Sequence, residues 1–303
     1  MSNFEVSMPA RQFSEQITQV NNVEAGVVKF WGVRGLIATP GSNTNRYGGN
    51  TSCVEMSIGG KHLIFDGGTG LRMLGKSLPE LSLPIDAHLF FTNSQSNRIQ
   101  GFPFFTPAFI PGNCFHIYGA AAPHGAWIKQ YLQEQMLQPH FPYPFQVMQS
   151  ELKFNNLTCE RVISLDDITI TTSLINKTHC SLGYRIDWQG RSIAYVTDLQ
   201  VGGELEEATS LGVSQTRLQK LSENADLLIA NATYTYSDTQ KNLSPLPQWQ
   251  TAVDLAHSAG VKQLILSYHH PDDDDETLAQ MQTEVESAFP QASLAYEGLS
   301  LVI

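Results

Sequence analysis

Short apolar runs separated by polar turns recur along most of the chain, and this pattern predicts a structure rich in β-strands. Gly, Asn or Pro follows many of the runs, which is typical of strands that end in tight turns. Gln189-Gly190-Arg191 separates two such runs and predicts a hairpin. The predicted strands are Val27–Val33, Cys53–Ile58, His62–Phe65, Ala87–Phe91, Phe115–Tyr118, Ile168–Ile175, Leu182–Trp188, Ser192–Val196, Asp226–Ala230, Gln263–Ser267 and Leu299–Val302.

Helical composition and spacing occur in a smaller set of segments. Pro139–Phe145 is expected to be extended, because closely spaced prolines are incompatible with a helix. Residues 1–26 have weak periodicity and are expected to form an N-terminal extension to a single domain over residues 27–303. Strands first, and then strands interleaved with helices, predict an α/β fold of two sheets packed face to face with helices outside. The predicted helices are Ala126–Met136, Leu218–Glu223, Thr251–Ala259 and Thr277–Ala288.

Composition narrows the classes of function. The 303 residues include 18 Lys and Arg against 29 Asp and Glu, and the formal charge of −11 disfavours a general role in binding nucleic acid or anionic membranes. Neither a signal peptide nor an apolar run of membrane-spanning length is visible. The cysteines, Cys53, Cys114, Cys159 and Cys180, are widely separated, so we expect reduced thiols and a cytoplasmic protein.

Several blocks of sequence resemble a known superfamily. The segments Val28–Gly35, Arg46–Cys53 and Leu63–Gly70 are similar to the opening of the phosphodiesterase-like branch of the metallo-β-lactamase-fold hydrolases, which includes ribonuclease Z and phosphoribosyl cyclic phosphodiesterase. The resemblance implies an αββα sandwich of two mixed sheets flanked by helices. It also implies a dinuclear zinc or manganese centre that hydrolyses phosphodiesters, and a dimeric assembly.

The metal-binding motif of that family is replaced in this chain. After the apolar segment Leu89–Thr92, the family has Thr-His-x-His-x-Asp-His, whereas the same register here holds Asn93, Gln95, Asn97 and Arg98. Imidazoles and carboxylates bind the two metals and turn a bridging water into hydroxide near neutral pH. Amide oxygens are poor zinc ligands, and a guanidinium stays positively charged. The resemblance therefore predicts a site without metal.

Other positions of the family site follow the same trend. The resemblance places Lys177 at a histidine ligand, Asn231 at an aspartate, and Leu246 at the histidine often assigned to leaving-group protonation. Asp198 keeps the metal-bridging aspartate. The site is thus replaced in several motifs and not in one alone.

Two further positions are less clear from the sequence. The last histidine ligand corresponds to Tyr268 if Pro271 is aligned with the family proline, and to His269 if the paired histidines are aligned. Asp66 follows an apolar run and precedes two glycines, and its retention indicates a structural role in capping the next loop.

The replacements support two interpretations of the pocket. Arg98 and Lys177 supply positive charge where the metals would bind, so they are candidates for holding a small anion such as a nucleotide or phosphodiester. Alternatively, Arg98 pairs with Asp198 or Asp66 and only stabilises the fold, because a buried cation requires a partner. Under either interpretation we expect a catalytically inactive protein that binds an anionic ligand or a protein partner and needs no cofactor.

Two rival functions remain. A phosphodiesterase could rebuild its metal centre from His179, Asp198, His269 and His270, since three imidazoles and a carboxylate suffice chemically. A structural subunit could instead pair with an active homologue, because family members form dimers. The acidic run Asp272–Asp275 is a weaker candidate for cation binding, and its place before a predicted helix is typical of N-terminal capping.

Overall fold

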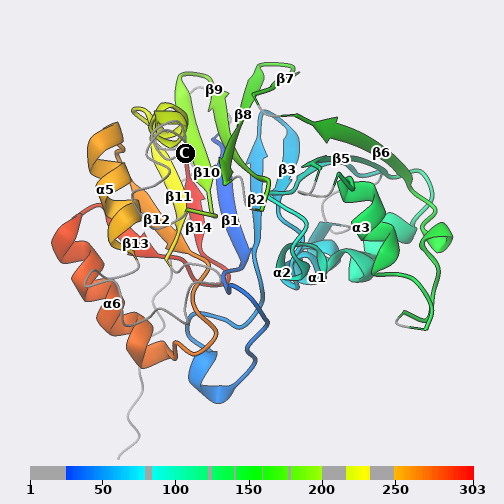
Figure 1. The fold of residues 1–303 in the computed structure, drawn as a ribbon, viewed down its shortest axis with the longest axis horizontal. Helices are drawn as coiled ribbons and strands as arrows, with labels where there is room; N and C mark the ends of the chain where they lie inside the picture. The colour runs from blue at the N-terminus through cyan, green and yellow to red at the C-terminus, as the bar shows by residue number, and fades with distance from the viewer. Residues whose placement is uncertain are drawn as a thin grey trace, which may run out of the picture.

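The computed structural model describes residues 25–78, 84–121, 125–139, 141–158, 160–176, 179–199, 216–232 and 249–303. Most of the expected N-terminal extension lies outside these residues, and so do Lys177 and Leu246. Two seven-stranded sheets pack face to face, and helices cover both outer faces (Figure 1). The predicted αββα sandwich is confirmed.

The first sheet combines an antiparallel half with a parallel half. β1 pairs antiparallel with β14 and with β2, and β2 pairs antiparallel with β3. From β3 to β6 all pairs are parallel. The sheet order is β14 (Ser300–Val302), β1 (Val27–Gly32), β2 (Cys53–Ile58), β3 (Lys61–Phe65), β4 (Asp86–Phe90), β5 (Cys114–Ala120) and β6 (Glu151–Leu157).

The second sheet repeats this arrangement. Its strands from β7 to β10 are antiparallel, and those from β10 to β13 are parallel. The predicted hairpin joins β9 to β10, and both Gln189 (φ 47°) and Gly190 (φ 76°) adopt the left-handed conformation of a type I′ turn. The sheet order is β13 (Ala292–Leu294), β12 (Leu264–Ser267), β11 (Leu227–Asn231), β10 (Arg191–Val196), β9 (Ser181–Trp188), β8 (Ile168–Asn176) and β7 (Val162–Leu165).

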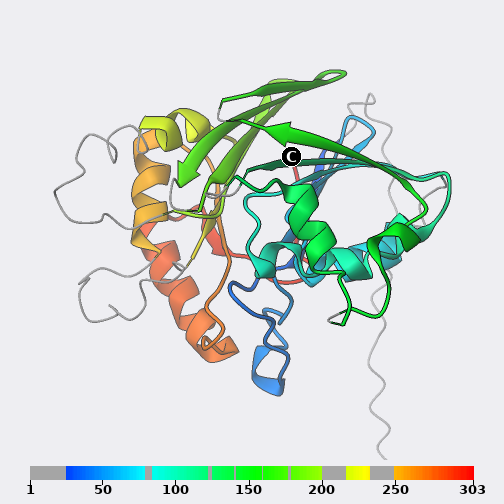
Figure 2. The same ribbon diagram turned by 45° about the vertical axis from the view of Figure 1, so that its right-hand side comes forward.

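Helices cover the outer faces of the two sheets. α1 (Gly70–Ser77) and α3 (Ile128–Glu134) pack on the first sheet, whereas α5 (Gln250–Ala259) and α6 (Asp275–Ala288) pack on the second, as Figures 1 and 2 show. Residues 216–222 are also helical. The short helical segments are α2 (Ser96–Ile99), η1 (Ser42–Thr44), η3 (Phe102–Phe104), η4 (Thr106–Phe109) and η5 (Phe145–Val147). None of the helices in the described ranges has the length and apolar character needed to cross a lipid bilayer.

The core between the sheets comes from the inward-facing residues of both. Phe65 packs against Phe90, Tyr184 and Tyr195, with ring centroids 5.1 to 5.5 Å apart. All four rings are buried. These rings lie next to the strand ends that carry the polar site. Their packing therefore fixes the position of one sheet relative to the other.

The acidic run Asp272–Asp275 has a structural role. Asp274 caps α6 by accepting a hydrogen bond from the Thr277 backbone at 2.8 Å. Asp275 accepts hydrogen bonds from the backbone nitrogens of Arg46 and Tyr47 at 2.8 and 3.1 Å. The capping interpretation is therefore confirmed, and these carboxylates tie α6 to the loop before β2.

Some sequence predictions were incomplete. Each predicted strand matches an observed strand with ends shifted by no more than two residues, but β6, β7, β13, α1 and α2 were not predicted. The helix predicted over Ala126–Met136 is shorter and is observed at Ile128–Glu134. The extended segment predicted over Pro139–Phe145 was wrong for the described residues. The Phe141 backbone donates to the Leu137 carbonyl at 3.1 Å, residues 141–143 are bent, and Phe145 begins a 3-10 turn. Closely spaced prolines exclude a regular helix but not turns.

Candidate functional site

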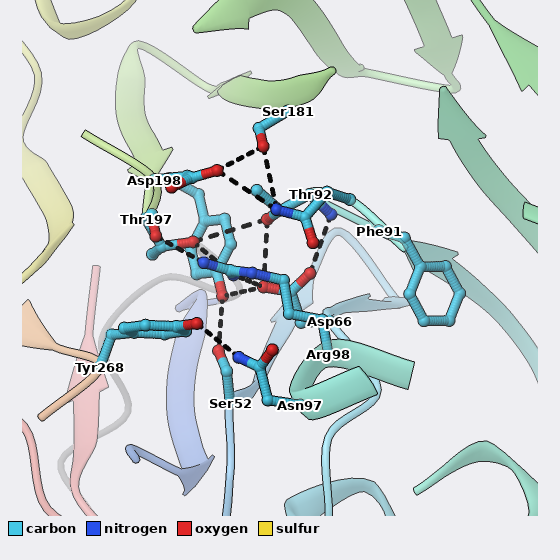
Figure 3. A network of polar contacts seen from close by, with 12 residues as sticks. Ser52, Asp66, Phe91, Thr92, Asn97, Arg98, Ser181, Thr197, Asp198 and Tyr268 are labelled. Carbon is cyan, nitrogen blue, oxygen red and sulfur yellow. Dashed lines mark hydrogen bonds and ion pairs between the residues drawn. The ribbon is translucent and has the colours of Figure 1, made fainter. Parts of the chain in front are cut away.

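The candidate site is formed where parallel strands of both sheets end. Asp66 follows β3, Thr92 follows β4, Asp198 lies two residues after β10, and Tyr268 follows β12. Because the carboxyl ends of these strands meet at one edge of the sandwich, residues far apart in sequence form one polar network (Figure 3).

Arg98 lies at the centre of this network. Its guanidinium forms an ion pair with Asp66, and the two side chains are 1% and 0% exposed. Nη1 also donates to the Thr197 hydroxyl at 2.9 Å, and Nη2 donates to the Thr197 carbonyl at 2.5 Å. The guanidinium carbon lies 4.5 Å from the centroid of the Tyr268 ring. Arg98 is therefore buried among protein groups, and Figure 3 shows its contacts with Asp66 and Thr197.

Asp66 is held as firmly as its partner. The Thr92 backbone donates to Oδ1 at 2.8 Å, while the hydroxyls of Thr92 and Tyr195 donate to Oδ2 at 3.0 and 2.9 Å. Its backbone has a φ of 60°, in the left-handed region that aspartate tolerates better than most residues. Of the two partners proposed for Arg98, the structure selects Asp66. Asp66 itself acts as an internal counter-ion and is more than a loop cap.

The surroundings keep Arg98 positively charged. Burial by itself would lower the pKa of Arg98, but the Asp66 carboxylate raises it above its ordinary value. Burial also raises the pKa of Tyr195, so its hydroxyl stays protonated and can donate to Asp66. The network therefore contains a permanent cation.

A second cluster surrounds Asp198. Asn93 Nδ2 donates to Asp198 Oδ2 at 3.2 Å and to Ser181 Oγ at 2.9 Å, and the Ser181 hydroxyl donates to the same carboxylate. His179 Nδ1 lies 3.2 Å from Asp198 Oδ2. The hydrogen bond to Asp198 raises the pKa of His179. Burial alone would raise the pKa of Asp198, but the His179 hydrogen bond and the charge of Arg98 lower it.

The structure places Tyr268, and not His269, in the site. The Tyr268 hydroxyl accepts a hydrogen bond from Asn97 Nδ2. His269 Nε2 contacts the Ala295 carbonyl at 2.7 Å instead, and its ring packs edge-on against Tyr47. Tyr268 has a φ of 63°, which is rare for an aromatic residue. The alignment on Pro271 is the one that matches the geometry.

Other predicted site residues have structural partners. Asn231 Oδ1 accepts a hydrogen bond from the Leu199 backbone at 2.9 Å, which joins the ends of β11 and β10. Gln95 precedes α2, and its backbone donates to Asn93 Oδ1 at 3.0 Å. The Gln95–Asn93 contact holds the loop that carries Arg98, whereas the Asn231 contact fixes strand ends of the second sheet, so these replaced residues have structural roles.

The four residues of the alternative metal centre do not come together. His179 contacts Asp198, but His269 points to Ala295, and His270 Nδ1 lies 3.6 Å from Asp272. Within the described ranges, the only set of three or more His, Cys, Asp or Glu ligand atoms close enough to share a metal lies elsewhere in the fold. The rebuilt centre is not the arrangement that these side chains adopt.

The family's dinuclear metal centre does not fit the residues present. The described side chains that line the network offer carboxylates, amides, hydroxyls and the His179 imidazole, and Arg98 places a buried positive charge among them. The family's zinc centre uses several imidazoles, of which the described network has one, and a divalent cation would be repelled by the guanidinium. The described side chains of the network form hydrogen bonds and charge pairs.

Sequence reasoning did not identify several members of the network. Thr92, Ser181, Tyr195 and Thr197 have no motif of their own, and their roles depend on how the two sheets face each other. The available signal was indirect. Arg98 was predicted to need a buried partner, and buried charged groups generally require further hydrogen bonds.

Comparison with known proteins gives structural matches only. No protein-family model matches the chain, and no curated protein matches its sequence. Similarity becomes visible when whole structures are compared.

The matching solved structures cover most of the chain. The metallo-β-lactamase fold protein YhfI from Bacillus subtilis is 18% identical, with a TM-score of 0.62 over 91% of this chain and 99% of that chain. Zn²⁺-bound PqqB from Methylobacterium extorquens is 15% identical, with a TM-score of 0.63 over 91% and 100%. The short form of human tRNase Z is 16% identical, with a TM-score of 0.57 over 91% and 98%. The chain has the metallo-β-lactamase fold.

Proposed function

We propose that this chain is a non-hydrolytic protein of the metallo-β-lactamase fold that acts by binding. The observation that carries the proposal is the Arg98 guanidinium, buried against Asp66 in the motif where the resembling hydrolases have metal ligands. A fixed cation there supplies charge to the surrounding carboxylates but cannot generate hydroxide. In this proposal the chain keeps the fold of the hydrolases but lacks the metal centre that hydrolyses their substrates.

A protein partner fits the geometry better than a small anion held by Arg98. Arg98 has no exposed surface, and its Nη1 and Nη2 groups already donate to Asp66 and Thr197. The neighbouring Asp198 is negatively charged and would repel an anion. Arg98 therefore has a structural role, and the partner is recognised by residues on the protein surface.

An exposed aromatic cluster supports the choice of a protein partner. Phe104 and Tyr143 are 51% and 60% exposed, and Phe141 lies between them, with ring centroids 5.6 Å from Phe104 and 6.4 Å from Tyr143. Clustered aromatic rings on a surface are typical of protein interfaces, because they bury large apolar areas on association. We assign this cluster, Phe104, Phe141 and Tyr143, as the docking surface.

Metal content and hydrolysis test the absence of metal chemistry. The wild type and Asp198→Asn should contain the same amount of zinc and manganese, because Asp198 binds no metal in this proposal. Neither protein should hydrolyse bis-p-nitrophenyl phosphate. Loss of a stoichiometric metal on Asp198→Asn, or turnover that this substitution abolishes, would establish a metal-dependent hydrolase instead.

Exchange of exposed residues tests the docking surface. The tagged double variant Phe104→Ser, Tyr143→Ser should fail to form the complexes that the wild type forms in the native cell, with an unchanged melting temperature. Val162→Ser is the matched control, since Val162 is also an exposed apolar side chain but lies on β7. Equal complex formation by all three proteins would reject the aromatic cluster as the partner surface.

A further inference from the structure

Three potential metal ligands converge far from the Arg98 network. Asp86 begins β4, and Cys114 and His116 lie on one face of the adjacent β5. His116 Nε2 is 3.5 Å from Asp86 Oδ1 and 3.6 Å from Cys114 Sγ. All three ligand atoms lie within 4.8 Å of one another. One imidazole nitrogen thus faces both a carboxylate and a thiol.

Two of the three spacings match those of ligands on one tetrahedral zinc ion, and the third pair, Asp86 and Cys114, lies within 4.8 Å. With typical Zn–N, Zn–S and Zn–O bond lengths, tetrahedral geometry places nitrogen and sulfur ligands about 3.6 Å apart and nitrogen and oxygen ligands about 3.4 Å apart. The observed 3.6 and 3.5 Å need little adjustment. The set contains thiolate, imidazole and carboxylate, which are the donor types that zinc prefers.

The sheet holds the three side chains in place before any metal binds. Asp86 and Cys114 are direct neighbours in the parallel pairing of β4 and β5. The turn before Cys114 is fixed by Asn113, which accepts a hydrogen bond from the Ile85 backbone at 2.8 Å and donates to the Pro107 carbonyl at 2.9 Å. The strand positions are therefore rigid, and only small side-chain rotations are needed.

Contacts of His88 behind His116 favour the same arrangement of the three ligands. The His88 ring stacks on His116 at 4.6 Å and its Nδ1 lies 3.2 Å from the Tyr118 hydroxyl, which fixes the orientation of His116.

Lys153 is the nearest lysine: it pairs with Glu151 at 3.1 Å and also hydrogen-bonds the Cys114 thiol, from which a metal ion would displace it. Lys61 pairs with Asp166 at 2.9 Å. Asp86 is exposed, and Cys114 and His116 are partly exposed, so an ion can enter directly from solvent. The site is therefore open to solvent, and binding requires the exposed Lys153 side chain to move away from Cys114.

We propose that Asp86, Cys114 and His116 form a zinc-binding site with a water molecule as the fourth ligand. The carboxylate oxygen, the thiolate sulfur and His116 Nε2 each donate an electron pair to Zn²⁺. The Cys114 thiol loses its proton to solvent as the metal–sulfur bond forms. This site is separate from the Arg98 network and needs no metal there.

Zinc binding to the purified full-length protein tests the proposal. The wild type, stripped with chelator and dialysed, should take up one equivalent of Zn²⁺, whereas Cys114→Ser and Asp86→Asn should each lose at least tenfold in affinity. His62→Gln is the matched control, because His62 also contacts a carboxylate, Glu55, at 3.1 Å in the same sheet but has no thiol beside it. Equal affinity in the wild type, Cys114→Ser and Asp86→Asn would overturn the site.

Cobalt substitution provides a direct signature of the thiolate. Co²⁺ added to the wild type should produce a sulfur-to-cobalt charge-transfer band that is absent in Cys114→Ser and retained in Cys180→Ser. Because one thiol proton is released, zinc affinity should rise by up to tenfold for each pH unit while Cys114 is protonated in the free protein. A band that follows Cys180 would place the metal elsewhere and reject the proposal.

Zinc binding to the variants distinguishes failure of this zinc site from failure of the proposed non-hydrolytic function. If zinc is lost on Asp198→Asn while Cys114→Ser retains it, both the new site and the non-hydrolytic function are overturned. If neither the wild type nor the variants bind zinc, only the Asp86–Cys114–His116 site is overturned. Zinc that is lost on Cys114→Ser and retained on Asp198→Asn supports both.

Discussion

The Arg98–Asp66 pair has almost no contact with solvent, so each charge depends on the other for its stability. We expect Arg98→Ala to lower the free energy of unfolding by about 3–5 kcal/mol, because Asp66 would remain as an unpaired buried carboxylate. Urea denaturation measures this loss. The control is the double variant Arg98→Met, Asp66→Asn, which removes both charges and should recover most of the stability. A loss below about 1 kcal/mol for Arg98→Ala would contradict the assignment of an internal counter-ion.

His269 makes the stability of the protein dependent on pH. Burial lowers the pKa of His269 to about 4, below the ordinary value of 6.5. The unfolded chain therefore takes up a proton as the pH falls from about 6.5 to 4, while the folded protein does not. Stability is complete above pH 6.5 and is lost through this window by up to about 1.4 kcal/mol per pH unit for this residue.

Substitution of His269 tests this pH dependence. His269→Gln can still donate to the Ala295 carbonyl, and it should flatten the decline in unfolding free energy between pH 6.5 and 4. His88 will retain its own share of the decline, since burial lowers its pKa to about 4 as well. His257→Gln, which replaces an exposed imidazole, should leave the slope unchanged. An equal slope in His269→Gln and the wild type would be the opposing result.

At the level of elements, the loop and helix α2 that carry Arg98 are locked against the turn after β3. Gly101 donates to the Gly67 carbonyl at 2.9 Å, and Gly67 in turn donates to the Arg98 carbonyl at 2.6 Å. A Cβ atom on Gly101 would overlap the Gly68 carbonyl oxygen. This close backbone approach explains why α2 can hold a buried charge with only one helical turn.

We predict that Gly101→Ala lowers the free energy of unfolding by about 2–3 kcal/mol, because backbone atoms of the Gly67–Gly68 turn must move. Thermal and urea denaturation measure the effect. Gly41→Ala is the control, since its Cβ would meet only the flexible Asn43 side chain at 2.8 Å. Both glycines have negative φ, so the comparison isolates crowding. Similar stability in the two variants would mean that α2 is free to shift.

Individual strands and helices show which parts of the fold could be predicted from the sequence. The strand predicted at Asp226–Ala230 was found because its apolar run, Leu227–Ala230, is buried on both faces. β6 (Glu151–Leu157) was missed, because it is an edge strand whose polar residues face solvent. α1 (Gly70–Ser77) was missed because its two glycines weaken the helical pattern.

The candidate site was predictable only in part, for a related reason. The loss of metal ligands could be seen residue by residue, but the choice between Tyr268 and His269 could not. A shift of one residue at a strand end directs a side chain to the opposite face, and the sequence allowed both alignments. The partner of Arg98 likewise depended on how the two sheets face each other.

At the scale of the whole molecule, both sheets show the same succession of antiparallel and then parallel strands. This arrangement explains the location of the site, because the parallel strands of both sheets end at one edge and bring Asp66 and Asp198 together. Two carboxylates buried there require positive charge, and Arg98 provides it.

If Arg98 substitutes for metal charge, restoring the family motif should make the protein depend on metal. We expect the variant Asn93→His, Gln95→His, Asn97→Asp, Arg98→His to be less stable than the wild type, since Asp66 loses its partner. Zn²⁺ should then stabilise this variant, by about 2.7 kcal/mol when present at a hundred times its dissociation constant.

Adding Cys114→Ser to every protein excludes the zinc site proposed on β4 and β5. Adding Asp198→Asn is the control and should abolish the gain. Melting temperatures with and without zinc measure the effect, and a motif-restored variant that zinc does not stabilise would show that Arg98 has no such role.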